Sequence, residues 1–405
     1  MRPMNAEDVL DGRTVELHDL SCRRERDEWV VGRIDTGRFI AVPEDGKRVI
    51  DLLGEKLTTT AVHDRLLAET GRDVDVDAFV EALTRYGFVR AGDEAAPVPP
   101  SWLPRLTSRH VRWLMARWLW VVVGVWNLGG LVLLVSHADR MPMPSDLLAV
   151  ERGSVILLAQ LGTIWASIFV HELAHLLTAR ACDVPGRMRL GTRLQFLVVE
   201  TDVSGIWHAG RRERLAVYLS GIAVNVTLAT VGLIAVLFGA PPLAFLGTVV
   251  FLAQVMLIVP QFFAFMRTDV YFVVQDLFGC RNLFGDATAF LAYLWARLRR
   301  GPAADPSGAL PRRERYVVRA YSVFVAIGSV VCVGVSLTIT LPVAVPLVAR
   351  SVGTLLSGGS GAAMVDAAVV LGAIVIGQVL WATAFWKRKR SGIMNWLRLR
   401  KERAS

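Results

Sequence analysis

The sequence predicts a mainly α-helical membrane protein, in which a polytopic helical bundle of about six spans follows a small N-terminal α+β domain of winged-helix-like pattern. Hydrophobic residues make up 53% of the 405 residues, and they are concentrated after residue 100. There they form runs of about 20 residues, the length that a helix needs to cross a bilayer. Arginines crowd beside these runs, as the positive-inside rule predicts for cytoplasmic loops.

Residues 1–95 form the predicted soluble domain. We expect a hairpin over 28–42, because apolar-rich stretches flank Asp35-Thr36-Gly37. Three short helices are expected to follow, near 43–57, 58–70 and 76–89, with the hydroxyl residues from Thr58 onward placed to cap the second. A winged-helix-like domain of this kind can read DNA or bind a peptide at its hairpin edge, and the fold alone does not choose between these roles.

Residues 96–112 are predicted to be a proline-rich and basic linker, and residues 391–405 a basic cytoplasmic tail that lies on the inner leaflet. Between them, the membrane domain is expected over residues 113–390. Pro342 and Pro346 leave the end of its fifth span open. The predicted spans lie near 113–136, 154–178, 214–239, 243–265, 316–341 and 364–386.

Arginine placement predicts the orientation of the spans. Arginines are frequent in the loops after the second and fourth spans, whereas the loops 137–153 and 346–363 contain few. Both termini are therefore expected in the cytoplasm. The N-terminus has acidic residues and no apolar core, so no signal peptide is expected. The net charge of +9 is explained by this membrane pattern, and no nucleic-acid partner is expected.

The sequence His171-Glu172-Leu173-Ala174-His175 is an H-E-x-x-H motif. On a helix, residues four apart share a face, so both imidazoles can reach one Zn²⁺ ion, and Glu172 can act as general base beside them. An apolar run over 156–170 leads into the motif, and ionisable groups at membrane depth are costly and usually functional. A polar helix end that merely meets water is the alternative, but it does not explain the metal-ligand spacing.

A catalytic zinc site needs a third protein ligand and an open position. Asp269 is the predicted third ligand, because it lies at the inner end of the fourth span, at the depth that the arginine-based topology gives His171 and His175. Asp276 is the competing candidate, but it lies farther beyond the apolar run.

With these motifs in order, the sequence resembles the site-2 protease family of intramembrane zinc metallopeptidases. His171–His175 match the family's zinc helix, Ser220–Asn225 resemble its later G-x-x-x-N element, and Arg267–Leu277 resemble its D-G-Y segment. The resemblance implies that His171, His175 and Asp269 bind Zn²⁺, that Glu172 is the catalytic acid/base, and that Asn225 lies near the substrate or the scissile carbonyl. Two departures concern backbone geometry: Val270 replaces the glycine after the aspartate, and Ile222 replaces a proline after Gly221.

The N-terminal domain resembles the PqqD-like recognition element of pathways that make ribosomally synthesised, modified peptides. Together with a site-2-type protease, this arrangement is similar to peptide zinc metalloproteases of such pathways. The resemblance implies a bacterial cell-membrane protein that holds a leader peptide at residues 1–95 and cuts it at the membrane site. The partner is then a peptide or membrane-protein substrate.

Residues 188–199 partly alternate in hydrophobicity and could form an edge strand that holds the substrate extended, or a plain surface hairpin. Two other function classes compete with this interpretation. A catalytically idle transporter or immunity protein would have no need of His171, Glu172, His175 and Asp269 together. A membrane-tethered DNA-binding regulator would need a basic recognition helix, whereas residues 76–89 carry Asp77, Glu81 and a single arginine.

Overall fold

The structure is a computed structural model, and it describes residues 14–25, 28–90, 101–149, 153–193, 196–301 and 304–402, without the side chains of residues 339 and 388–402. It is mostly helical, as predicted, and divides into two compact units. The N-terminal unit comprises Met1–Leu114, Leu176–Arg187 and Thr201–Arg214. The membrane unit comprises Met115–His175, Met188–Glu200 and Leu215–Ser405.

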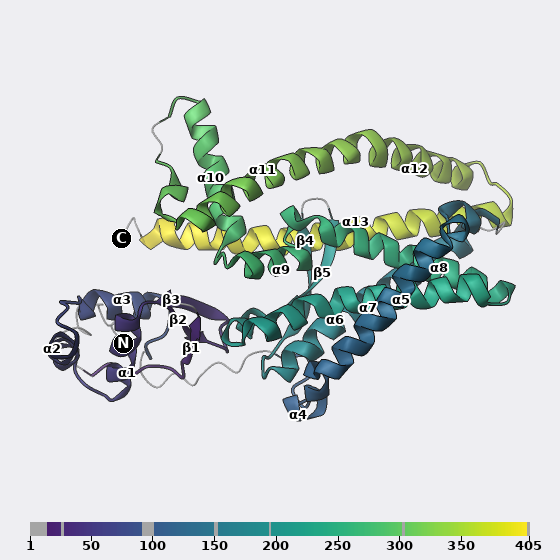
Figure 1. The fold of residues 1–405 in the computed structure, drawn as a ribbon. Coiled ribbons are helices and arrows are strands. Elements are labelled where there is room, and N and C mark those ends of the chain that lie inside the picture. The colour runs from purple at the N-terminus through teal and green to yellow at the C-terminus, as the bar shows by residue number, and fades with distance from the viewer. Residues whose placement is uncertain are drawn as a thin grey trace. The chain divides into compact units, whose positions relative to one another are not determined.

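The N-terminal unit contains a three-stranded antiparallel sheet and three helices (Figure 1). Its strands and helices are β1 (Ser21–Glu25), β2 (Glu28–Arg33), β3 (Arg38–Val42), α1 (Glu44–Gly54), α2 (Thr59–Thr70) and α3 (Val76–Arg85). The predicted hairpin is confirmed as β2–β3, with Val31 opposite Ile40. β1 was not predicted, because its sequence SCRRE is charged and lacks an apolar alternation.

The sheet and helices of this unit enclose one apolar core. Val31, Val49, Leu52, Val62 and Leu83 are completely buried in it. The predicted cap of α2 is confirmed, since the hydroxyl of Thr58 accepts a hydrogen bond from the backbone N–H of Ala61 at 3.3 Å. The short helix η5 (Ser204–His208) also contacts the three strands, so part of the loop after the second span belongs to this unit.

The guanidinium of Arg214 is buried within the N-terminal unit. It forms an ion pair with Glu25 of β1 at 2.7 Å and lies over the ring of Trp207. Burial alone would raise the pKa of Glu25, but the hydrogen bonds and charges of Arg214 and Arg23 outweigh it and hold this pKa below its ordinary value. The ion pair therefore connects β1 to the first turns of α7.

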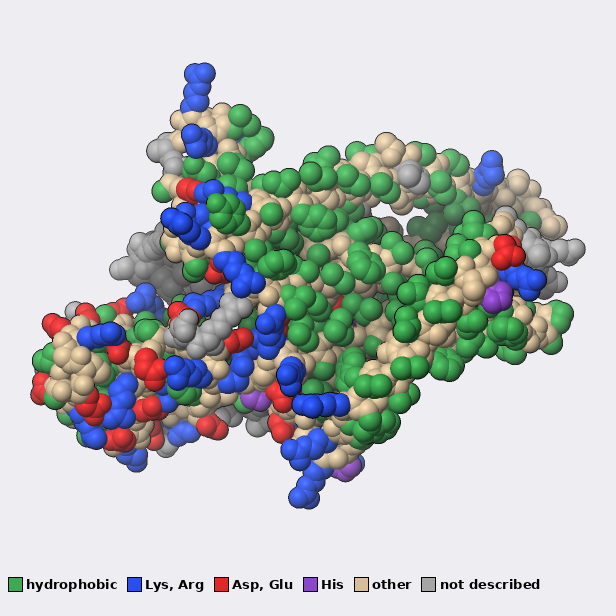
Figure 2. Space-filling model, viewed as in Figure 1, with side chains coloured by type: hydrophobic (Ala, Val, Ile, Leu, Met, Phe, Trp, Pro, Cys, Tyr) green, Lys and Arg blue, Asp and Glu red, His purple; other side chains and the backbone are tan. Residues whose placement is uncertain are grey.

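Among the residues that the structure describes, six helices are long and apolar enough to cross a membrane, as predicted. These candidate spans are α5 (Arg117–Ser136), α6 (Gly153–Ala181), α7 (Arg211–Phe238), α8 (Pro241–Ile258) with η6 (Val259–Phe262), α11 (Arg312–Val335) with α12 (Leu341–Leu356), and the first part of α13 (Gly361–Glu402). Hydrophobic side chains cover most of the visible surface of the membrane unit, whereas charged side chains crowd the N-terminal unit (Figure 2).

The fifth span does not end at its prolines. A π-helical turn over Ser336–Thr340 joins α11 to α12, which contains Pro342 in its first turn and Pro346 in its interior. A proline removes a backbone donor and clashes with the preceding turn, and a wider turn before it relieves both problems. The helix therefore continues to Leu356, and the predicted loop 346–363 is shorter than expected.

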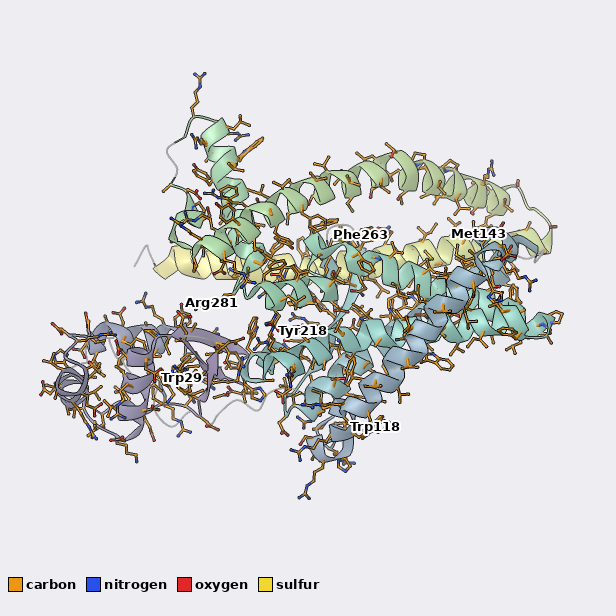
Figure 3. The ribbon with its side chains drawn as sticks, viewed as in Figure 1. Trp29, Trp118, Met143, Tyr218, Phe263 and Arg281 are labelled. Atoms are coloured by element: carbon orange, nitrogen blue, oxygen red, sulfur yellow. The ribbon has the colours of Figure 1, made fainter. Side chains whose placement is uncertain are left out.

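Two helices between the fourth and fifth spans were not predicted. They are α9 (Asp269–Phe278) and α10 (Leu283–Leu298), and α10 has only 16 residues, too few for a span. They pack with α11 around Tyr271, Leu283, Val318 and Tyr321. In addition, Tyr218 of α7, which is labelled in Figure 3, stacks on Phe272 of α9. Their ring centroids are 5.5 Å apart. These contacts hold the start of α9 against α7.

Short elements complete the connections. The predicted linker is described only from residue 101 onward, and α13 continues as a helix through the predicted tail to Glu402. Residues 91–100 and 403–405 lie outside the described part of the chain. The short elements are α4 (Ser108–Val111), η2 (Arg112–Met115), η3 (Ala138–Arg140), η4 (Pro144–Ala149), η7 (Ala264–Met266) and η8 (Pro306–Ala309), together with the strand pair β4 (Arg187–Arg193) and β5 (Phe196–Asp202).

Candidate metal centre

The two histidines of the H-E-x-x-H motif lie one turn apart on α6 and share a face. Both are almost fully buried, and their Nε2 atoms are 3.1 Å apart. Because α6 runs without interruption through the apolar stretch before the motif, the helix carries both imidazoles inside a candidate membrane span. The expected i, i+4 geometry is thus present.

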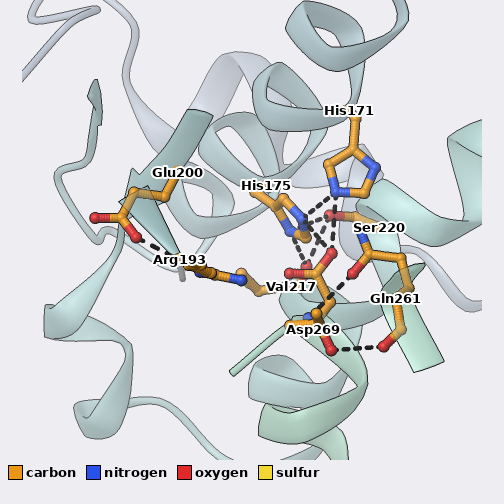
Figure 4. A network of polar contacts seen from close by, with 9 residues as sticks. His171, His175, Arg193, Glu200, Val217, Ser220, Gln261 and Asp269 are labelled. Atoms are coloured by element: carbon orange, nitrogen blue, oxygen red, sulfur yellow. Dashed lines mark hydrogen bonds and ion pairs between the residues drawn. The ribbon is translucent and has the colours of Figure 1, made fainter. Parts of the chain in front are cut away.

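Asp269 meets the histidines from a different element (Figure 4). Its Oδ2 lies 2.9 Å from Nε2 of His171 and 3.1 Å from Nε2 of His175. Asp269 is the first residue of α9 and not the end of the fourth span as predicted, because the chain leaves α8 through η6 and η7 before α9 starts.

Gln261 fixes the backbone around Asp269. Its side-chain Oε1 accepts a hydrogen bond from the N–H of Asp269 at 3.2 Å, and its backbone carbonyl accepts one from the hydroxyl of Thr268 at 2.5 Å. Arg267 adopts a left-handed conformation with φ 60°, so the reversal occurs before the aspartate. Val270 is then helical and needs none of the conformational freedom of a glycine.

α7 forms the wall behind the imidazoles. The carbonyl of Val217 accepts a hydrogen bond from Nδ1 of His175 at 2.7 Å, which leaves Nε2 of that ring free to bind a metal. A Cβ atom at Gly221 would lie 2.5 Å from Nε2 of both histidines, so only glycine fits at this position. Ile222 lies inside the unbroken helix α7, which shows that no proline is needed there.

The three side chains have the chemistry of a metal site. His171, His175 and Asp269 each offer one ligand atom, all within 4.8 Å of one another, and could hold a metal ion. Burial alone would raise the pKa of Asp269, but the neighbouring imidazoles of His175 and His171 outweigh it and lower this pKa. Two nitrogen ligands and one carboxylate match catalytic zinc sites that keep one position open.

No family model, curated protein or solved structure matches the chain.

The remaining residues that the sequence singled out lie on the helices that form the metal centre, α6, α7 and α9. Glu172 is buried and follows His171 directly. Asn225 is 1% exposed and lies one turn beyond Gly221 on α7, but it contributes no atom to the ligand group. Its Oδ1 has no hydrogen-bond partner in the described part of the chain. Asp276, the competing ligand candidate, is buried two turns farther along α9 and is not part of the group.

β4 and β5 pair as a two-stranded hairpin. For residues 188–199 the sequence had left open an edge strand that holds substrate or a plain surface hairpin. Within the membrane unit, Glu200 pairs with Arg193 at 3.6 Å (Figure 4). It also pairs with Arg189 at 2.9 Å. The turn of the β4–β5 hairpin, residues 194–195, lies outside the described residues. A role of this hairpin in holding substrate stays a prediction.

Sequence reasoning missed the supporting residues of the site. Gly221 was noted only as part of a motif, and Val217 and Gln261 were not noted. A glycine four residues before an asparagine in an apolar run was a usable signal for Gly221. Val217 acts through its backbone carbonyl, so its side chain carries no such signal.

Proposed function

We propose that this protein is an intramembrane zinc metalloprotease of the site-2 protease type, which hydrolyses a peptide bond. The observation that carries this proposal is the convergence of His171, His175 and Asp269 at ligand distance, with Glu172 next to them, within and beside apolar helices. Buried ionisable groups in such helices are costly, and a metal site with an adjacent general base gives them a function.

The chemistry follows from the residues present. A zinc ion held by the three ligands would lower the pKa of a bound water from 15.7 to about 7 and polarise the scissile carbonyl. Glu172 accepts a proton from the attacking water and returns it to the nitrogen of the leaving amine, so the C–N bond breaks and a carboxylate and an amine result. Val217 holds His175 in the tautomer that presents Nε2.

The substrate class is the finer part of the proposal. β1 and β3 are the edge strands of the small N-terminal sheet, and an edge strand can pair with an extended peptide. We propose that this sheet holds the leader of a ribosomally made, modified peptide. We place the protein in a bacterial cell membrane with both termini in the cytoplasm. The DNA-binding alternative is less favoured, since α3 carries Asp77 and Glu81 against a single Arg85.

Metal analysis of the purified full-length protein tests the ligand assignment. We expect about one equivalent of zinc, as in a three-ligand catalytic site, and its loss in His171→Ala. His208→Ala is the matched control, because His208 lies in η5 in the N-terminal unit. Unchanged zinc in His171→Ala would disprove the assignment.

Cleavage of transmembrane peptides tests the role of Glu172. The variant Glu172→Gln keeps the size of the side chain but cannot accept the proton, so it should retain zinc and lose cleavage by at least about 100-fold. Cleavage by Glu172→Gln at the rate of the wild type would refute the role of this residue.

A further inference from the structure

One turn along α6 from the ligands, two helices bring buried polar side chains together. Nε2 of Gln254 in α8 donates a hydrogen bond to the hydroxyl of Ser167 in α6 at 2.7 Å. Gln254 is completely buried, and Ser167 is 5% exposed. The second amide atom of Gln254, Oε1, has no hydrogen-bond partner among the residues that the structure describes.

The level of Asn225 follows from the register of α6 and α7 by extrapolation. His175 lies against Val217, and His171 lies against Gly221 one turn farther along, so the two helices run antiparallel. By helical periodicity, the next turn in the same direction would bring Asn225 opposite Ser167. Ser167, Asn225 and Gln254 form what we call the polar layer, about 6 Å from the ligand turn by the rise of four helical residues.

The polar layer contains two buried carboxamides that are incompletely paired. Oδ1 of Asn225 and Oε1 of Gln254 both lack a hydrogen bond in the described part of the molecule. Exchanging the oxygen and nitrogen positions of the Gln254 amide would not remove the unpaired group. The Ser167 hydroxyl would then donate to the amide oxygen, and the amide nitrogen would be unpaired instead. Buried polar groups without a partner are rare in folded proteins and indicate a missing ligand or water.

We propose that the polar layer binds the backbone of the substrate, through hydrogen bonds between the carboxamides of Gln254 and Asn225 and the peptide groups next to the scissile bond. The inference rests on the proposed proteolysis. A transmembrane helix satisfies its own backbone groups, and unwinding it for cleavage leaves N–H groups unpaired where lipid offers no acceptor. Carboxamide oxygens at this depth supply those acceptors.

The proposal identifies Gln254 as a substrate-binding residue. A peptide group carries one donor and one acceptor, so it satisfies either orientation of the Gln254 amide. The neutral carboxamides also suit a neutral backbone, because a charged group would be costly to bring to this depth.

Backbone substitution in the substrate is the direct test. The probes are alanine–leucine transmembrane peptides of about 25 residues with a central Gly-Gly pair, in detergent micelles, and copies with one amide near the scissile bond replaced by an ester. An ester lacks the N–H donor. When the ester stands at one or two of these positions, we expect kcat/KM of the wild type to fall by about tenfold, because one buried hydrogen bond is lost.

Variants of the protein connect that loss to the polar layer. Gln254→Leu should cleave the parent peptides about tenfold more slowly, keep its zinc, and no longer discriminate against the ester at the sensitive position. Asn127→Leu is the matched control, because both amide atoms of Asn127 are hydrogen-bonded, to Ala223 at 3.4 Å and to Thr227 at 3.1 Å. In this control, the ester should lower kcat/KM as much as it does in the wild type.

The outcomes separate this proposal from the proposed function. Cleavage that depends on Glu172 but shows no ester penalty at any position, or the same penalty in Gln254→Leu, overturns the binding role and indicates a resident water in the polar layer. Absence of Glu172-dependent cleavage of all parent peptides overturns the proteolytic function, and the binding role with it. If Gln254→Leu does not fold, the ester series on the wild type and on Gln254→Met gives the answer.

Discussion

At the residue scale, the candidate metal centre depends on one position where no side chain is tolerated. Gly221 faces both imidazoles, and any Cβ atom there would overlap the ligand nitrogens. Its neighbour along α7, Val217, orients His175 through a backbone carbonyl. α7 thus shapes the site without contributing a ligand.

Gly221→Ala should therefore weaken metal binding. The added Cβ would displace both imidazoles from their contact with Asp269, and we expect zinc affinity to fall by about 10- to 100-fold, as for other losses of support around a metal site. Competition with a zinc chelator on the purified protein measures this. The matched control is Gly162→Ala in α6, where a Cβ meets no atom within 4 Å. Equal affinity in the two variants would show that α7 is not close to the imidazoles.

At the element scale, the first turn of α7 is anchored by the buried ion pair between Arg214 and Glu25. Arg214 is fully buried, whereas the side chain of Glu25 is 28% exposed. Removing the charge of Glu25 would leave a buried guanidinium without its partner, which costs more than the net contribution of an intact pair.

Glu25→Gln should lower the free energy of local opening of β1 and β2 by about 2 kcal/mol, less than for a fully buried pair because Glu25 is partly exposed. Hydrogen exchange of the sheet amides in the full-length protein measures it. Glu69→Gln removes a carboxylate from the exposed Arg48–Glu69 pair and should have little effect. An equally large effect of Glu69→Gln would show that burial of Arg214 does not matter.

The same pair predicts a pH dependence. The folded unit lowers the pKa of Glu25 below its ordinary value of 4.5, so the pair stabilises at neutral pH, and this stabilisation is lost as pH falls through the lowered pKa. The wild type should then lose exchange protection in β1 and β2 at acid pH more steeply than Glu25→Gln.

At the scale of the whole molecule, six apolar helices separate loops that should alternate between the two sides of a membrane. From the arginine bias we expect the residues between α5 and α6, and those between α12 and α13, to lie opposite to both termini. The orientation also decides from which side a peptide reaches the metal centre.

Labelling with a membrane-impermeant maleimide should confirm this topology. In a background without the natural cysteines, Asp139→Cys and Ser357→Cys should react from outside intact cells, whereas Asp305→Cys should react only after the membrane is opened. Labelling of Asp305→Cys in intact cells would reverse the orientation or change the number of spans.

The sequence alone was sufficient for six candidate spans, though not for the end of the fifth, for the hairpin, and for the three residues that could hold a metal. Spans follow from the length of apolar runs, which lipid imposes on every helix that crosses it, and the two histidines follow from the period of the helix. The choice of Asp269 over Asp276 came from depth alone, and the structure brings Asp269 and not Asp276 into the ligand group.

Only the tertiary structure showed that Asp269 starts a separate helix, that Gly221 closes the site, and that Gln254 of α8 bonds to Ser167 of α6. The physical reason is that these features depend on packing between segments far apart in the chain. No local periodicity encodes the register of α6 against α7, and side-chain volume at the contact decides it.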